Sequence, residues 1–164
     1  MTLVYPQLVT GADLLRGIIK LNELAPLLKS RGATSASIVN SKLYGVRTFS
    51  KVLKRHGIRP VIGLSVNLNI GEEQEVLVYI YAQNDIGYHN LMKISSAISV
   101  GETETLPLKW LKAYGASCSI VCPMTNSSWD ESRSEESIRL IKEECKQSNV
   151  YIGVARPGGQ IHVD

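Results

Sequence analysis

The sequence predicts an α/β protein with about six mostly parallel strands and flanking helices. Short segments rich in β-branched residues alternate with segments of helical spacing, and most connections between strands are long enough to hold a helix. Repeated β–α units of this length form a largely parallel sheet, which is either open or curled into a barrel. A chain of 164 residues, with 44% hydrophobic and 20% charged residues, fits one such domain with a substantial core.

The six expected strands are short apolar runs. The third is rich in Val, Ile and Leu, as a strand buried on both faces should be. The segment NIGEEQ at 69–74 is a turn too short to hold a helix, so we expect the third and fourth strands to pair antiparallel. The strands are expected at Leu3–Thr10, Ala33–Val39, Pro60–Leu68, Glu75–Ala82, Ala116–Val121 and Val150–Val154.

Five helices are expected between these strands. In the first, Leu21–Arg31, the apolar spacing stops at Gly32, but Pro26 lies inside the pattern. An interior proline costs up to about 3 kcal/mol, so the helix is expected either to begin close to Pro26 or to be kinked there. The remaining helices are expected at Tyr44–His56 with a cap at Gly57, after Asn84 or Asp85, at Pro107–Tyr114 and at Asp130–Gln147.

Residue chemistry alone predicts no catalytic, cofactor-binding or metal-binding residue. The chain has neither of the glycine-rich phosphate motifs, and its three histidines are scattered. Cys118, Cys122 and Cys145 are expected to be buried free thiols. No apolar run approaches the roughly 20 residues of a membrane span, and no signal peptide is evident. We therefore expect a cytoplasmic protein without membrane contact.

A basic stripe on the second helix is the candidate nucleic-acid contact. Arg47, Lys51 and Arg55 recur at i, i+4 and i+8, so they share one helix face. Such a stripe can line a phosphate backbone, although it can equally be the solvated outer face of a helix packed on a sheet. The net charge of +3 is too small to decide between the two. Tyr79 and Tyr81 alternate on a strand, where they form either a stacking platform or packing contacts.

Several segments agree in order and spacing with one family. They are LYG at 43–45, then Phe49, Lys51, Gly57, Ile58, Pro60, Ile62 and Gly63, then IGYHNLMKISS at 86–96, LKWL at 108–111 and SIVCP at 119–123. Together they resemble the N-terminal polymerase and histidinol phosphatase (PHP) domain of the alpha subunit of bacterial DNA polymerase III. The resemblance runs from Val4 to about Ile152. It implies a PHP-type distorted β/α barrel, here incomplete, and a single PHP domain over 1–164 that is a C-terminally truncated fragment of a much longer polymerase.

The resemblance also locates the positions of the family's metal ligands. Members that keep the metal site carry His-x-His on the first strand, an Asp-His pair ending the second and a Glu on the third. The corresponding residues of this chain are Gln7 and Val9, Val39 and Asn40, and Ser65. Clustered metals need imidazoles and carboxylates to offset their charge. The resemblance therefore implies a degenerate site without metal, and metal-dependent phosphoester hydrolysis is not expected.

The function expected from the resemblance is that of a non-catalytic PHP domain in DNA replication. It would give structural support and dock partners within a DNA-directed DNA polymerase, a nucleotidyltransferase whose Mg²⁺ belongs to the parent active site. Expected partners are the remainder of the alpha subunit, other replisome proteins and, through the parent chain, DNA. Two alternatives stay open: a metal-dependent phosphoesterase with unusual ligands, and a nucleic-acid-binding module that uses Arg47, Lys51 and Arg55.

Overall fold

The computed structural model describes residues 3–8, 21–71, 74–101, 105–123 and 131–153. Within these ranges, strands and helices alternate along the chain as the apolar pattern predicts. The strands are β1 (Leu3–Leu8), β2 (Ala33–Asn40), β3 (Arg59–Gly71), β4 (Gln74–Ala82), β5 (Thr105–Pro107), β6 (Cys118–Pro123) and β7 (Asn149–Gly153). The helices are α1 (Leu21–Ser30), α2 (Val46–Arg55), α3 (Asp85–Val100), α4 (Leu108–Tyr114) and α5 (Glu131–Glu144).

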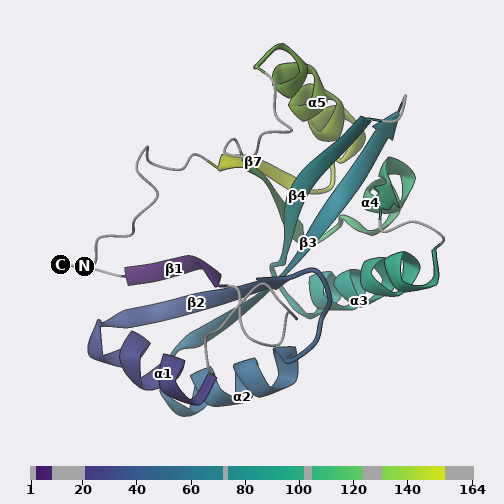
Figure 1. Ribbon diagram of the computed structural model, residues 1–164. Helices are drawn as coiled ribbons and strands as arrows, with labels where there is room; N and C mark the ends of the chain where they lie inside the picture. The colour runs from purple at the N-terminus through teal and green to yellow at the C-terminus, as the bar shows by residue number, and fades with distance from the viewer. Residues whose placement is uncertain (1–2, 9–20, 72–73, 102–104, 124–130, 154–164) are drawn as a thin grey trace.

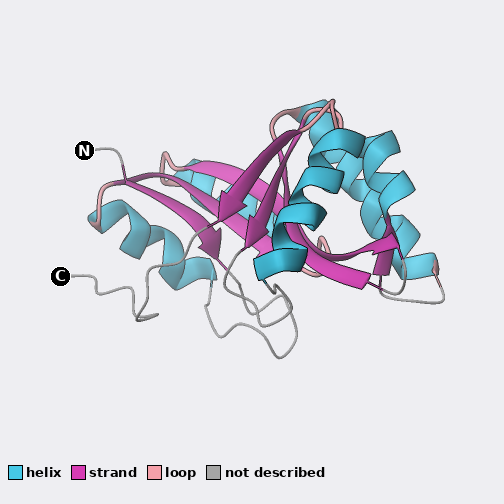
Figure 2. Ribbon diagram, turned by 90° about the horizontal axis from the view of Figure 1, so that it is seen from above, coloured by secondary structure: helices cyan, strands magenta, loops and turns pink. Residues whose placement is uncertain are grey.

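The described strands form one mixed sheet in the order β1-β2-β3-β4-β6-β7, with β5 paired to β3 away from this path. β1, β2 and β3 are parallel, and so are β6 and β7. β4 runs antiparallel to both of its neighbours, which confirms the antiparallel pairing expected from the short turn. The sheet bends strongly between its β1–β2 part and its β4–β6–β7 part, which gives a curled half-barrel rather than a flat layer (Figures 1 and 2).

Two apolar clusters hold the helices against one face of this sheet. The first joins α1 and α2 to β2, with Phe49 and Ile38 fully buried at its centre. The second joins α3, α4 and α5 to the even-numbered residues of β3, β4 and β6, among them Leu64, Ile80 and Ile120. Because side chains alternate along a strand, the odd-numbered residues of β3 and β4 lie on the opposite face. That face is the concave side of the half-barrel, and we call it the inner face.

Helix ends follow the sequence signals closely. Gly57 has φ 74°, and Ile58 donates its amide N–H to the Leu53 carbonyl across 3.0 Å, while Gly57 donates to Lys54. This pair of bonds is a Schellman motif, in which the left-handed residue is glycine because it carries no Cβ. After β4, Asn84 caps α3 by accepting a hydrogen bond from the amide of Gly87 at 3.0 Å. Both caps were expected from the sequence.

Three features differ from the expected elements. Pro26 lies well inside α1, five residues after the helix begins, so the helix does not start at the proline. β3 extends to Gly71 and β4 begins at Gln74, so most of the expected turn at 69–74 continues the two strands. The three-residue strand β5 was not expected, because it is very short and ends in proline.

Candidate functional site

The positions that correspond to metal ligands fall on both faces of the sheet. In the strand register, Val39 lies beside Gly63 and Asn40 lies beside Leu64. Val39 and Ser65 therefore belong to the inner face, whereas Asn40 shares the helix-covered face with Leu64. Asn40 and Ser65, the polar side chains that the structure describes at these positions, do not converge on a common point. Gln7 lies on β1, and Val9 lies outside the described residues.

The inner face beside Ser65 is filled by packed side chains. Val39, Gly63 and Tyr81 form a row across β2, β3 and β4. A Cβ built on Gly63 would lie 2.9 Å from Cδ1 of Tyr81 and 3.0 Å from Cγ2 of Val39. The tyrosine ring and the valine methyl therefore close over the glycine. Burial, together with the nearby Tyr79, raises the pKa of Tyr81 to about 12, so the phenol stays protonated and is no general base at neutral pH.

Asn40 is buried without a hydrogen-bond partner in the described part of the chain. Its side chain is 1% exposed, and neither amide atom, Nδ2 or Oδ1, has such a partner. An unpaired buried amide is costly, so this residue is an unusual feature of the sheet. Among the described residues, no group of three or more His, Cys, Asp or Glu side chains could hold a metal ion. The donors present at these positions do not fit the clustered metal site that the resemblance implies.

The cysteines supply no reactive thiol. Cys118, Cys122 and Cys145 are free and buried, as the sequence predicts. Burial raises the pKa of Cys118 and of Cys145 to about 11, and that of Cys122 to about 12. All three thiols therefore stay protonated at neutral pH and behave as small apolar side chains of the second cluster.

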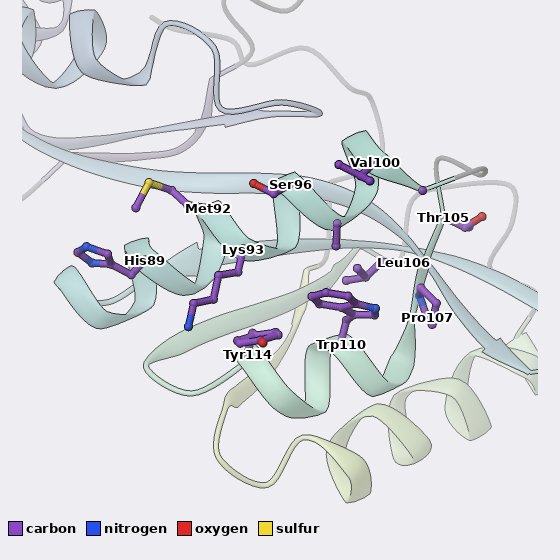
Figure 3. Close-up of a pocket in the computed structure, with 12 residues that line it drawn as sticks. His89, Met92, Lys93, Ser96, Val100, Thr105, Leu106, Pro107, Trp110 and Tyr114 are labelled. Atoms are coloured by element: carbon purple, nitrogen blue, oxygen red, sulfur yellow. The ribbon is translucent and has the colours of Figure 1, made fainter.

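A first surface groove, which we call the α3–α4 groove, lies between α3, β5 and α4. It has a volume of about 870 Å³ and is mainly apolar, with Met92 and Val100 exposed on α3. On the α4 side, the rings of Trp110 and Tyr114 lie 5.4 Å apart between centroids, at 31°. Figure 3 shows both rings turned toward α3, with Lys93 reaching toward Tyr114. The Nζ atom of Lys93 lies 4.9 Å from the centroid of the Tyr114 ring. The sequence did not indicate this groove, because its walls come from separate elements.

A second groove, the α2–α3 groove, lies between α2 and the corner where β4 leads into α3. Its volume is about 520 Å³, and residues 60–62 of β3 also line it. Three cationic side chains line it, namely Arg47, Lys54 and Arg59. Of the basic stripe expected from the sequence, Arg47, Lys51 and Arg55 are all exposed on α2, but only Arg47 lines this groove. Nucleic-acid contact by the stripe stays a prediction.

Among the described residues, no helix is both long enough and apolar enough to cross a membrane.

α4 and α5 are joined at the surface, where Lys112 Nζ lies 2.7 Å from Glu144 Oε2. The hydrogen bond from Lys112 lowers the pKa of the Glu144 carboxyl, and the same contact raises the pKa of Lys112. This exposed pair orients two helices and has no catalytic geometry.

Comparison with known proteins agrees with the fold. Residues 8–156 match the family model of the PHP domain. The DNA polymerase III subunit alpha of Campylobacter jejuni is 34% identical over 145 residues, covering 80% of this chain and 12% of the relative. That of Bacillus subtilis is 31% identical over 118 residues, covering 70% of this chain and 10% of the relative. The chain thus spans about a tenth of the length of these relatives.

Among solved structures, a candidate metal-dependent phosphoesterase from Bifidobacterium adolescentis has a similar fold. It superposes with a TM-score of 0.61 at 10% identity, over 90% of this chain and 76% of that protein. At this identity the likeness concerns the fold alone, and it confirms the PHP-type α/β architecture expected from the sequence. The family match over most of the chain, together with the similarity to two alpha subunits, is decisive: this chain belongs to the PHP domain family.

Proposed function

We propose that this chain is a non-catalytic PHP domain of a replicative DNA polymerase III alpha subunit, where it supports the polymerase structurally and docks partners. One observation carries the proposal: the ligand positions on β2 and β3, which the structure describes, do not offer converging donors. Val39 packs over Gly63 beside Tyr81, while Asn40 lies on the opposite face from Ser65. A cluster of divalent cations needs several anionic or imidazole ligands around one point, and these residues supply none.

The names of the relatives support the rest of the proposal. Deoxynucleotide addition, with its Mg²⁺ ions, would be carried out by the remainder of such an alpha subunit and not by these residues. The partners of the domain would be that remainder, other replisome proteins and, through the parent chain, DNA. Such a protein works in the cytoplasm.

An active phosphoesterase is the second candidate, favoured by the fold shared with the Bifidobacterium protein. The purified chain should be incubated with p-nitrophenyl phosphate and with Mn²⁺ or Zn²⁺, and its metal content measured by elemental analysis. We expect no metal-stimulated release of nitrophenol and less than one equivalent of bound transition metal. A rate that rises with metal and falls on chelation would overturn the non-catalytic assignment.

For docking, we propose that the α3–α4 groove receives an apolar segment from the remainder of the alpha subunit. The groove exposes Met92 and Val100, whose contact with water is unfavourable, beside the large rings of Trp110 and Tyr114. The relatives are about seven times longer than this chain, so each carries much polypeptide that could cover such a surface. Aromatic and methionine side chains are enriched at the centres of protein interfaces.

Binding to the C. jejuni alpha subunit without its own PHP domain tests this docking. We expect the double variant Met92→Lys/Val100→Lys to weaken the complex at least tenfold, because two charges enter an apolar contact. The double variant Lys51→Glu/Arg55→Glu, on exposed positions of α2, is the control. The C. jejuni PHP domain serves as the positive standard. Unchanged affinity of the groove variant would exclude this surface.

A further inference from the structure

The α2–α3 groove gathers cationic side chains from two separate elements. Arg47 and Lys54 come from α2, and Arg59 is the first residue of β3. In the part of the chain that the structure describes, none of these three side chains forms a hydrogen bond or an ion pair. Elsewhere, Lys112 and Arg139 are paired with glutamates. The three groove cations are therefore available to a ligand.

The charge in this groove is not balanced by the protein itself. Asp85 is the single carboxylate among its described lining residues, so an excess of two positive charges faces the cavity. Asn84 and Asp85 also bring the N-terminal end of the 16-residue helix α3 to the groove wall. The partial positive charge at a helix N-terminus adds to the potential of the three cations. A concave surface focuses such a field, which favours an anionic occupant over a neutral one.

The spacing of the cations describes the size of that occupant. Arg47 and Lys54 are seven residues apart on α2, which is about two turns and roughly 10 Å along the helix axis. Since seven residues bring a helix almost back to the same face, both side chains can address one elongated ligand. A single monovalent anion would contact only one of them. A chain of linked phosphates can contact Arg47, Lys54 and Arg59 together, with Ser50 lining the same groove as a possible hydrogen-bond donor.

We propose that the α2–α3 groove is a binding site for a ligand with two or more linked phosphate groups. Two sources share this chemistry: a free polyphosphate, such as pyrophosphate or a nucleoside triphosphate, and the backbone of a single-stranded nucleic acid. The inference goes beyond the proposed function and does not rest on it, because neither the missing metal ligands nor the α3–α4 groove enters the argument. It also differs from the stripe of Arg47, Lys51 and Arg55, since two of those residues lie outside the groove.

The chain provides a matched pair of variants for the test. Lys54→Gln/Arg59→Gln removes one lysine and one arginine charge inside the groove. Lys51→Gln/Arg55→Gln removes one lysine and one arginine charge from exposed positions outside it. All four side chains are exposed, so both proteins should keep the circular dichroism and urea midpoint of the parent. Affinity for pyrophosphate is measured by isothermal titration calorimetry. Affinity for a fluorescent 12-nucleotide thymidine oligomer is measured by anisotropy at 50 and 200 mM NaCl.

We expect the groove variant to lose at least tenfold in affinity and the control variant less than twofold. For the oligonucleotide, losing two phosphate contacts should reduce the slope of log K against log salt by about 1.4, at roughly 0.7 for each contact on a single strand. Tight pyrophosphate binding that displaces the oligonucleotide identifies a free polyphosphate as the ligand. Oligonucleotide binding without pyrophosphate binding identifies a nucleic-acid backbone. The proposal is overturned if neither probe binds below 1 mM, or if both double variants lose affinity equally.

Discussion

Replacing Asn40 by leucine should stabilise this domain. The asparagine is 1% exposed, and both of its amide atoms lack a hydrogen-bond partner in the described structure. A buried polar group left unpaired costs about 1–3 kcal/mol, and leucine removes this penalty while keeping a side chain branched at Cγ. The extra volume of leucine offsets part of the gain. We expect the free energy of unfolding to rise by about 1–2 kcal/mol, which for a chain of this length raises Tm by about 2–8 °C.

Urea unfolding followed by circular dichroism measures this change. The control is Asn67→Leu, because Asn67 is an exposed residue of the neighbouring strand and its replacement should change stability by less than about 0.5 kcal/mol. If Asn40→Leu instead lowers stability by more than about 1 kcal/mol, the amide has a stabilising partner and the reasoning fails. A third variant, Asn40→Asp, asks whether a cation can be held here. We expect it to be less stable at pH 7 than the parent and to gain nothing from Mn²⁺.

The remaining predictions concern packing and titration. Gly87→Ala should destabilise the domain by about 1–3 kcal/mol or more, since the new Cβ would collide with the backbone carbonyl of Ser117. Gly57→Ala should lose only about 1–2 kcal/mol through its left-handed φ of 74°, because no atom lies within 4 Å of the new Cβ; urea unfolding of both variants checks the order. The three buried thiols should react with Ellman's reagent at pH 8 only at the rate of unfolding, and rapid labelling of the folded protein would contradict their burial. Their pKa values of about 11–12, and that of Tyr81 at about 12, lie above the unfolded values. The unfolded chain therefore releases these protons first, and stability should be full below pH 8 and fall from about pH 9 to pH 12 in a pH series of urea midpoints.

Much of the fold could be predicted because local signals agreed with the tertiary structure. The apolar run of β3 and the short connection after it indicated an antiparallel hairpin, and the register confirms that pairing. Gly57 and Asn84 marked helix ends that the hydrogen bonds confirm. β5 could not be predicted, because three residues ending in proline carry no periodic pattern. Pro26 suggested a helix start that the structure does not have. Tertiary packing of Leu24, Ala25 and Leu28 keeps α1 helical through the proline.

The grooves needed the structure for a different reason. On α2, the sequence favoured the stripe of residues 47, 51 and 55. Each step of four residues along this stripe places the next side chain about 40° further around the helix axis. Lys54 lies only about 20° from Arg47 around the helix axis, and this could be predicted from their spacing of seven residues. Arg59 could not be added from the sequence, because its approach to α2 depends on the Schellman turn that leads α2 directly into β3. The groove cluster is therefore tertiary, and Arg47 is its one residue in common with the periodic stripe.

The row formed by Val39, Gly63 and Tyr81 bears on both the proposed absence of a metal site and the stability of the fold. A metal-binding barrel keeps polar space on its inner face, which is held open by charged ligands. Here the ring of Tyr81 and a methyl of Val39 lie against Gly63 on that face. The ring has its hydroxyl pKa raised to about 12, so burial adds a neutral group and no uncompensated charge. The contacts that close the inner face also stabilise the curled sheet. Reintroducing a carboxylate at Ser65 would therefore bring back one donor without the cavity that a metal cluster requires.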